Sequence, residues 1–300
     1  MKTTIMATII DGKKIASLIK EEIKNQVEEI ISKGGRAPHL VAVLVGDDGA
    51  SLTYVSNKVA SCKQVGFKSS LITLPYEIEE EKLLSEITRL NEDKEIDGFI
   101  VQLPLPKHID GDKVLLAINP KKDVDGFHPT NFGKMALDME TFVPATPYGI
   151  IELLERYNID TNGKHTVVIG RSNIVGRPIS ILMSRKAKWG NSTVTVVHSR
   201  TKNLEFFTKN ADIVISALGV PNFLKANMVK DGVVIIDVGI TRVKDLNKTK
   251  GYVLKGDVDF DSVKEKASYI TPVPGGVGPM TIISLLQNTL KAYHQSEKRI

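Results

Sequence analysis

The fold is indicated most clearly by residues 166–178, which read T-V-V-I-G-R-S-N-I-V-G-R-P. A short apolar strand runs into a glycine turn, and a helix is expected from Gly176. Small residues at such a turn let backbone N–H groups approach a pyrophosphate, and the N-terminus of the helix adds partial positive charge. The spacing G-x-S-x-x-x-G departs from the standard dinucleotide pattern G-x-G-x-x-G. A nucleotide site and a merely tight turn therefore both remain open here.

The end of the next predicted strand favours a particular nucleotide. Residues 193–197 (T-V-T-V-V) are followed by His198, Ser199 and Arg200. An acidic residue at this place reads a free ribose 2′-hydroxyl, whereas a 2′-phosphate is bound by cations and hydroxyl groups. Because a guanidinium can bind a phosphate bidentately, Arg200 and Arg171 favour NADP over NAD. An ordinary surface arginine is the alternative for Arg200.

Strand and helix patterns alternate along the chain. The first half predicts helices and strands in turn over 11–34, 39–46, 51–65, 67–74, 79–90 and 97–103, and the second half predicts strands over 166–169, 193–197, 213–216 and 233–238 with a helix over 176–187. Short apolar runs that alternate with helices are typical of parallel sheets covered on both faces. The sequence therefore predicts an α/β protein, in which the long loop 184–192 has no assigned role.

The division into domains follows from a proline-rich stretch. Residues 119–147 carry four prolines and predict little helix. We place the boundary there, with a first α/β domain over 1–146 and a Rossmann-like nucleotide-binding domain over 147–278. The final helix, within 279–300, is expected to pack back on the first domain, and the active-site cleft is expected between the two domains.

Composition excludes several classes of protein. The 300 residues are 42% hydrophobic and 25% charged, which is typical of a globular chain rather than a disordered one. The net charge of +5 comes from lysines mixed with glutamates, and aromatic residues make up 6%, so a basic nucleic-acid-binding protein is disfavoured. No apolar run approaches the length of a membrane span, and no export signal is expected.

Cysteine and histidine usage argues against a metal site. A single cysteine, Cys62, cannot form an intramolecular disulfide, which favours a reducing compartment and a cytoplasmic location. Cys62 is expected to be a small packed side chain. His108, His128 and His198 have no metal-ligand spacing, so no metal is expected.

Tyr54 and Lys58 lie four residues apart in a predicted helix and therefore share one face. An amphipathic helix with a solvated lysine is one interpretation. The Tyr-Lys pair of short-chain dehydrogenases is another, but that pair follows the nucleotide turn, whereas Lys58 precedes Gly170 by 112 positions (170 − 58).

Eight motifs follow one another along nearly the whole chain: S-L-T-Y-V-S-N-K (51–58), D-G with V-Q-L-P-L-P (97–106), K-D-V-D-G-F (122–127), P-A-T-P (144–147), G-R-S-N-I-V-G-R-P (170–178), D-V-G-I (237–240), G-D-V (256–258) and T-P-V-P-G-G-V-G-P-M-T (271–281). In this order they resemble the bifunctional methylenetetrahydrofolate dehydrogenase/cyclohydrolase family. The resemblance implies that 5,10-methylenetetrahydrofolate is oxidised with NADP and that the methenyl product is hydrolysed to 10-formyltetrahydrofolate, in one-carbon metabolism and purine precursor supply. It also implies a homodimer and a folate-binding first domain. A dehydrogenase-only member of the family is the alternative.

The resemblance also implies roles for individual residues. Lys58 carries protons, Gln102 holds it, Tyr54 packs against the folate rings and Asp125 binds the pterin. A lysine in a partly desolvated cleft that faces a cationic folate should have a lowered pKa, because burial and like charge both disfavour the ammonium. Asp123 is interpreted as a loop cap.

Two sets of binding residues complete the prediction. The cofactor set is Gly170, Arg171, Ser172, Ser199, Arg200 and Ile240. The substrate set is Tyr54, Leu103, Asp125, Pro272, Gly275 and Gly276.

Overall fold

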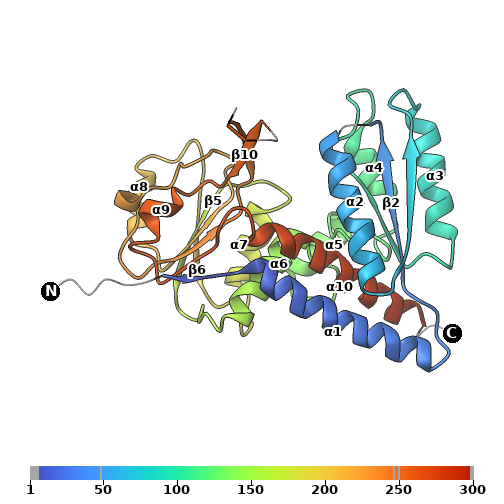
Figure 1. Ribbon diagram of the computed structural model, residues 1–300, viewed down its shortest axis with the longest axis horizontal. Helices are drawn as coiled ribbons and strands as arrows, with labels where there is room; N and C mark the ends of the chain where they lie inside the picture. The colour runs from blue at the N-terminus through green and yellow to red at the C-terminus, as the bar shows by residue number, and fades with distance from the viewer. Residues whose placement is uncertain (1–6, 48, 246, 249–250, 298–300) are drawn as a thin grey trace. The chain divides into compact units, whose positions relative to one another are not determined.

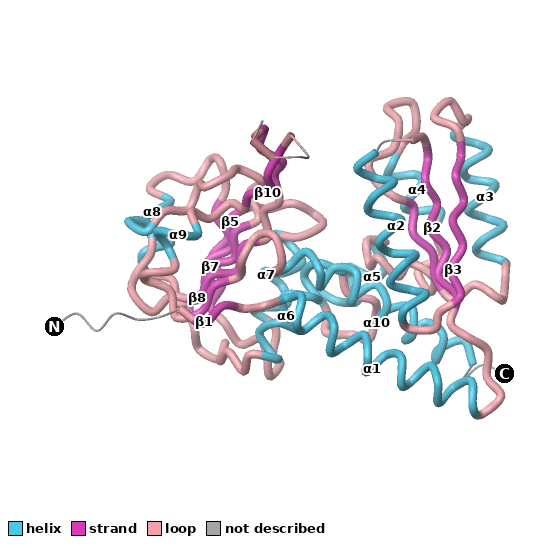
Figure 2. Tube along the Cα trace, viewed as in Figure 1, coloured by secondary structure: helices cyan, strands magenta, loops and turns pink. Residues whose placement is uncertain are grey.

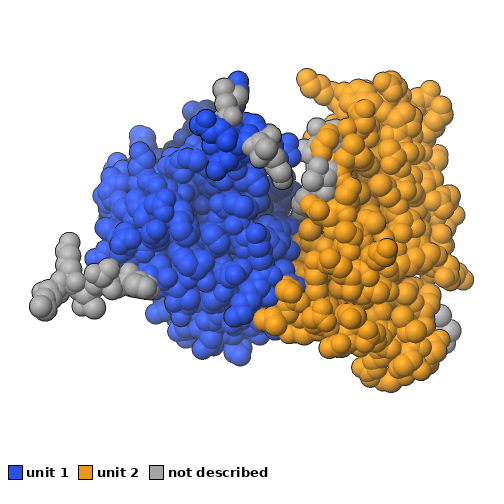
Figure 3. Space-filling model, viewed as in Figure 1, with its two compact units in different colours: residues 1–16, 146–281 blue, residues 17–145, 282–300 orange. Residues whose placement is uncertain are grey.

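The computed structural model describes residues 7–47, 49–245, 247–248 and 251–297, without the side chains of residues 50, 51, 53 and 54. It divides into two compact units, coloured separately in Figure 3. Unit 1 comprises residues 1–16 and 146–281, and unit 2 comprises residues 17–145 and 282–300. The sequence prediction grouped residues 1–16 with the first domain. The structure groups them with unit 1, because a short strand within them pairs with a strand near residue 270.

Unit 1 is built on a six-stranded sheet in which every neighbouring pair is parallel (Figures 1 and 2). The strand order is β1 (Thr8–Ile9), β11 (Tyr269–Ile270), β8 (Val234–Asp237), β7 (Ile213–Ser216), β5 (His165–Ile169) and β6 (Thr193–Val197). Its helices are α6 (Ala145–Arg156), α7 (Gly176–Ser184), α8 (Leu204–Lys209), α9 (Phe260–Val263) and the 3₁₀ turn η1 (Ala226–Met228).

The central strands of unit 1 are apolar and buried along their length. All four residues of β7 and of β8 are buried, and one core cluster joins them to η1 and α9 through Val214, Ile235 and Val263. Strands covered on both faces bury nearly every side chain, which is why they show apolar runs rather than alternation. Because the strands are parallel, the loops after β5, β6, β7, β8 and β11 all leave the same edge of the sheet.

Unit 2 carries a smaller parallel sheet in the order β3 (Lys68–Leu74), β2 (His39–Val45), β4 (Gly98–Val101). Its helices are α2 (Gly49–Gln64), α3 (Glu80–Glu92), α4 (Gly111–Ala117), α5 (Pro129–Ala136) and parts of α1 (Gly12–Ser32) and α10 (Val277–Glu297). Central β2 is wholly buried, whereas β3 at the edge alternates between exposed and half-buried residues. The prediction of two α/β domains is confirmed.

Two segments differ from the sequence prediction. The stretch 119–147 was expected to hold little helix, but it contains α5 and the start of α6. Pro129 is the first residue of α5, where its missing N–H loses no helical bond, so proline there favours a helix. The structure also has an antiparallel pair that no strand pattern predicted, β9 (Thr241–Lys244) and β10 (Tyr252–Lys255).

Each unit closes the amino-terminal end of its sheet with a histidine and an aspartate. In unit 2 the backbone N–H of His39 donates to Asp97, and in unit 1 that of His165 donates to Asp212, each at 2.8 Å. Each ring bridges to the neighbouring strand, with Nε2 2.9 Å from Oγ of Ser70 in one case and from Oγ1 of the matching threonine of β6 in the other. The two sheets therefore begin with the same local geometry.

The carboxyl ends of β2 and β5 also correspond. β2 runs into Gly46 and β5 runs into Gly170, with φ of +83° and +114° respectively. Glycine adopts such positive φ values without the penalty that a Cβ imposes. The next residue is the exposed Asp47 in unit 2 and the exposed Arg171 in unit 1.

Arg36 lies between the buried Asp97 and helix α10 in unit 2. Both terminal nitrogens of Arg36 donate to the carboxylate of Asp97 at 2.8 Å, and the guanidinium lies 5.1 Å from the ring centroid of Tyr293 in α10. The Asp97 side chain has no exposed surface, and it also accepts from His39 N–H and Ser296 Oγ. A buried carboxylate without its cation is strongly unfavourable.

We expect Arg36→Met to lower the free energy of unfolding by about 3 kcal/mol, because it leaves Asp97 buried without a cation. Urea denaturation measures this loss. The double variant R36M/D97N should regain part of it, since the amide carries no charge to desolvate. Lys33→Met is the control, because it breaks an exposed ion pair with Glu29 at the end of α1. If R36M lowered the free energy of unfolding no more than K33M does, the Arg36–Asp97 pair would not contribute to stability as proposed.

Candidate active site

Lys58 is buried on the inner face of α2. Its residue surface is 4% exposed, and it shares this face with Val55 and Cys62, three residues before it and four after it. Burial lowers the pKa of Lys58, because desolvation disfavours the ammonium, while the charge of Asp125 opposes this effect. The neutral amine is therefore more accessible here than on a solvated lysine.

Gln102 is oriented toward this amine. Lys58 Nζ donates to Oε1 of Gln102 at 3.3 Å, while Nε2 of the same amide donates to the carbonyl oxygen of Leu103 at 2.7 Å. The second bond fixes which end of the amide faces the lysine. Gln102 itself is placed by its backbone N–H, which donates to Val43 O in central β2.

The structure brings Lys58, Gln102 and Asp125 together in unit 2. Asp125 is half-buried, and its charge acts on Lys58. Leu103 follows Gln102 and is 48% exposed. Tyr54 lies one turn before Lys58 in α2, but its side chain lies outside the described residues.

Asp123 supports the loop that carries Asp125. Its carboxylate accepts from the backbone N–H of Gly126 at 3.1 Å and of His128 at 2.7 Å, and from Nδ2 of Asn131 at 2.8 Å. Burial raises the pKa of Asp123, and the bonds from His128 and Asn131 oppose that rise. The structure thus agrees with the interpretation of Asp123 as a loop cap.

Cys62 is a packed side chain. It is 1% exposed, and burial raises the pKa of its thiol to about 12. Such a thiol carries little thiolate and is a poor nucleophile.

The predicted phosphate turn lies at the carboxyl edge of the sheet in unit 1. A Cβ on Gly170 would clash with the carbonyl oxygen of Ala217, and one on Gly176 would clash with the carbonyl oxygen of Gly170. Ser172 Oγ accepts from the backbone N–H of Gly176 at 3.3 Å, at the start of α7. Arg171 is exposed beside it.

The turn after β6 lies next to this one, because Ile169 and Val197 are register partners at the ends of adjacent parallel strands. It is closed by His198, whose N–H donates to Oγ1 of Thr201 at 2.9 Å. Ser199 and Arg200 are exposed at its tip. A glycine turn with basic side chains on two neighbouring strand ends has the donor set that a dinucleotide with a 2′-phosphate requires.

Two buried carboxylates for which no role was predicted fix further loops at this edge. Asp257 accepts from the N–H groups of Leu218 and Val220 at 2.7 and 2.9 Å, and Asp237 accepts from three backbone N–H groups, including that of Asp257. Burial raises the pKa of Asp237 to about 7. They hold the loop after β7 and the loop that exposes Ile240. For Asp237 the sequence signal was an acidic residue at the end of a buried strand.

The glycine loop after β11 packs on the start of α1. Gly275 O accepts from the N–H of Lys13 at 3.1 Å, and Gly276 N–H donates to Pro272 O at 2.8 Å. A Cβ on Gly12 would clash with the Gly276 carbonyl oxygen. The loop follows β11 and so leaves the same edge of the sheet as the phosphate turn, and Gly275 and Gly276 are both buried.

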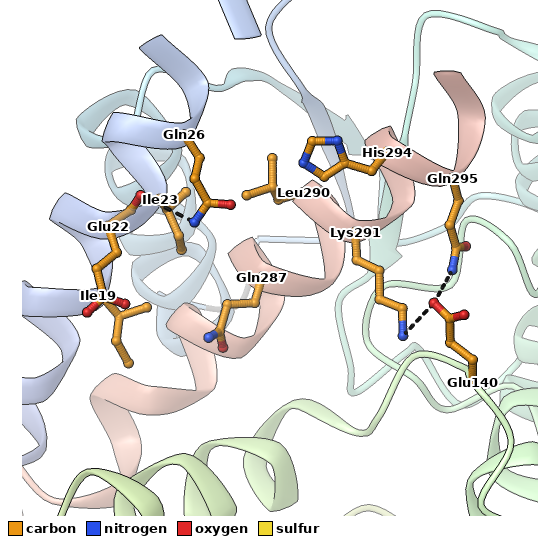
Figure 4. Close-up of a pocket in the computed structure, with 10 residues that line it drawn as sticks. All are labelled: Ile19, Glu22, Ile23, Gln26, Glu140, Gln287, Leu290, Lys291, His294 and Gln295. Carbon is orange, nitrogen blue, oxygen red and sulfur yellow. Dashed lines mark hydrogen bonds and ion pairs between the residues drawn. The ribbon is translucent and has the colours of Figure 1, made fainter. Parts of the chain in front are cut away.

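Other features lie apart from these residues. A cavity of about 350 Å³ in unit 2 is lined by residues of α1, α10 and the loop before α6, among them Ile23, Glu140 and Leu290, and by none of the predicted site residues (Figure 4). In the described part of the chain, no group of three or more His, Cys, Asp or Glu side chains could hold a metal ion. No described helix is long and apolar enough to cross a bilayer.

Comparisons with known proteins cover nearly the whole chain. The family model "Tetrahydrofolate dehydrogenase/cyclohydrolase, catalytic domain" matches residues 10–125, and "Tetrahydrofolate dehydrogenase/cyclohydrolase, NAD(P)-binding domain" matches residues 144–297. The "Bifunctional protein FolD" of Flavobacterium johnsoniae is 68% identical over 95% of this chain and 96% of its own. That of Flavobacterium psychrophilum is 65% identical over 96% and 98%.

Solved structures agree. The bifunctional FolD enzyme from Campylobacter jejuni has 46% identity and a TM-score of 0.91, over 98% of this chain and 100% of its own. FolD from Trypanosoma brucei, complexed with NADP and an inhibitor, has 39% identity and a TM-score of 0.92 over 97% and 99%. The chain, with its buried lysine in one unit and its phosphate turn in the other, therefore belongs to the tetrahydrofolate dehydrogenase/cyclohydrolase family.

Proposed function

We propose that the protein oxidises 5,10-methylenetetrahydrofolate with NADP and hydrolyses the resulting 5,10-methenyltetrahydrofolate to 10-formyltetrahydrofolate. The observation that carries this proposal is the buried Lys58 amine on Gln102 with Asp125 close by. A dehydrogenase-only enzyme would not need this proton carrier. The relatives at 68% and 65% identity are both named bifunctional, which favours the two-step reaction.

The residues at the carboxyl edge of unit 1 would hold the cofactor. The pyrophosphate would lie against the turn of Gly170 and Ser172 at the start of α7, where Gly170 has no side chain to block its approach. Arg171, Ser199 and Arg200 would bind the 2′-phosphate side, and the exposed Ile240 would offer an apolar contact. When bound, NADP supplies the hydride acceptor. The folate nitrogens share the positive charge as hydride leaves the methylene carbon, so this step depends on orientation more than on acid or base.

The hydrolytic step needs a base and then an acid. Water attacks the methenyl carbon and gives one proton to the neutral Lys58 amine, which leaves a neutral hydroxyl adduct. One carbon–nitrogen bond then breaks, the Lys58 ammonium protonates the departing nitrogen, and the hydroxyl proton passes to solvent as the formyl C=O forms. A lowered pKa suits both roles, since proton carriers work best near the ambient pH.

The remaining residues bind the folate. Asp125 would accept from the pterin N–H and amino groups, and Tyr54 and Leu103 would pack on the rings. Pro272, Gly275 and Gly276 would form a wall that approaches the substrate closely, because glycine has no side chain.

We further propose a homodimer in the cytoplasm. The dimer rests on membership of the family, and the location rests on a single buried thiol, which suits a reducing compartment. Sedimentation equilibrium at several protein concentrations tests the dimer.

We expect Lys58→Met to reduce cyclohydrolase turnover by about 10²- to 10⁴-fold, because no group remains to carry the proton. The decay of methenyl absorbance measures this step. Lys63→Met, the same change at an exposed position of α2, should leave turnover unchanged. Full cyclohydrolase activity in K58M would remove Lys58 from the mechanism.

The cyclohydrolase rate should rise with pH through the lowered pKa of Lys58, because the neutral amine acts on water. In Asp125→Asn this limb should move to lower pH, since the carboxylate of Asp125 raises the pKa of Lys58. The pH profile is measured as the single-turnover decay of methenyl absorbance at each pH, after subtraction of the rate that K58M shows at that pH. Asp138→Asn, which removes an exposed carboxylate, is the control. Identical limbs in D125N and D138N would contradict the assignment.

Arg200→Asp should weaken NADP binding by about 10- to 100-fold and leave NAD binding nearly unchanged, because only NADP offers a 2′-phosphate to the guanidinium. Titration calorimetry with each nucleotide measures both affinities. Lys202→Asp makes an equal charge change two residues along, at an exposed position. If R200D and K202D lowered the two affinities alike, Arg200 would have no specific role.

A further inference from the structure

The loop that carries Asp125 is fixed on both sides of that residue. Before it, a Cβ on Gly98 of β4 would clash with the side chain of Val124, so β4 approaches the loop closely. After it, Gly126 has φ +74° and its N–H is bound by Asp123. A carboxylate between two such anchors has little freedom to turn away.

A third anchor comes from the other end of the sequence. Asn288 of α10 is 2% exposed, and its Nδ2 donates to the carbonyl oxygen of Val124 at 2.8 Å and to that of Val143 at 3.0 Å. Val124 is the residue immediately before Asp125. One side-chain amide therefore uses both of its N–H groups to fix the backbone of the Asp125 loop and the segment that packs on Gly126.

This arrangement is more specific than helix packing requires. On the same face of α10, the positions three residues before and four residues after Asn288 are the buried Leu285 and Ala292. A buried amide beside them carries a desolvation penalty that an apolar side chain would avoid. Only the nitrogen of the amide can donate, so both carbonyl oxygens must face this one atom. The two bonds therefore also fix where the loop lies along α10. Neighbouring Thr289, also fully buried, bonds only within the helix, to Leu285 O.

We propose that Asn288 is a positioning residue for folate binding, which holds Val124 so that the Asp125 carboxylate meets the pterin. The inference rests on the proposed function of Asp125 and adds to it a contributor from α10. Asn288 contacts neither Lys58 nor Gln102 through any bond described above, so its effect should pass through Asp125.

Steady-state kinetics of the full chain tests the proposal with Asn288→Leu, which keeps a similar volume and removes both donors. The KM for methylenetetrahydrofolate should rise about 5- to 50-fold, because a charged contact becomes misaligned. NADP affinity, measured by calorimetry, should not change. Thr289→Val is the matched control: it removes a buried bond one residue away, and its folate KM should equal that of the wild type.

A double-mutant cycle with Asp125→Asn identifies the route of the effect. If Asn288 acts through Asp125, N288L should raise the folate KM in the wild type and add little in D125N. An equal rise in both backgrounds, or a wild-type KM in N288L, would overturn the proposal. D125N with an unchanged folate KM would instead contradict the proposed role of Asp125. If N288L does not fold, Asn288→Ser is measured in its place, because serine lacks the same two amide N–H groups but remains polar.

Discussion

Parallel strand pairing is the constraint on which both halves of the candidate site depend. In a parallel sheet every strand ends at the same edge, so residues far apart in sequence meet there without any direct attraction between them. In unit 1 this brings the turns after β5 and β6 side by side, through the pairing of Ile169 with Val197. In unit 2 it places Gln102, just after β4, on central β2 at Val43. The reacting groups then need only local adjustment, such as the burial that lowers the pKa of Lys58.

The two units share a frame and differ in chemistry. In both, a histidine N–H donates to an aspartate at the start of the sheet, and β2 and β5 each run into a glycine with positive φ. The side chains that follow decide what each edge can bind: exposed arginines in unit 1, and a buried amine with a nearby carboxylate in unit 2. Fold and function are thus specified by different residues of the same elements.

Sequence patterns predicted most of the sheet and helices, because long periodic segments carry a strong signal. Residues 193–197 and 213–216 were predicted with their observed limits. Helix α5 was missed, because prolines were read as breakers although Pro129 is a helix start. The Lys58–Gln102 pair was anticipated from the resemblance, whereas its local order was not, since Nε2 of Gln102 bonds to the carbonyl of its own neighbour.

Long-range polar contacts were beyond the reach of periodicity. Nothing in the apolar pattern of residues 283–290 indicates that Asn288 reaches Val124, 164 positions away. Asp237 and Asp257 were noted only as parts of motifs, because their partners are backbone N–H groups, which have no sequence signature.

The glycine turns at the ends of β2 and β5 offer similar backbone geometry but opposite charge, with Asp47 beside one and Arg171 beside the other. A polyanion approaching the molecule is repelled from the first turn and attracted to the second. The repeated turn therefore does not give a phosphate chain two competing binding sites. The charged side chains next to each turn distinguish the two sites, although the backbone conformation is repeated.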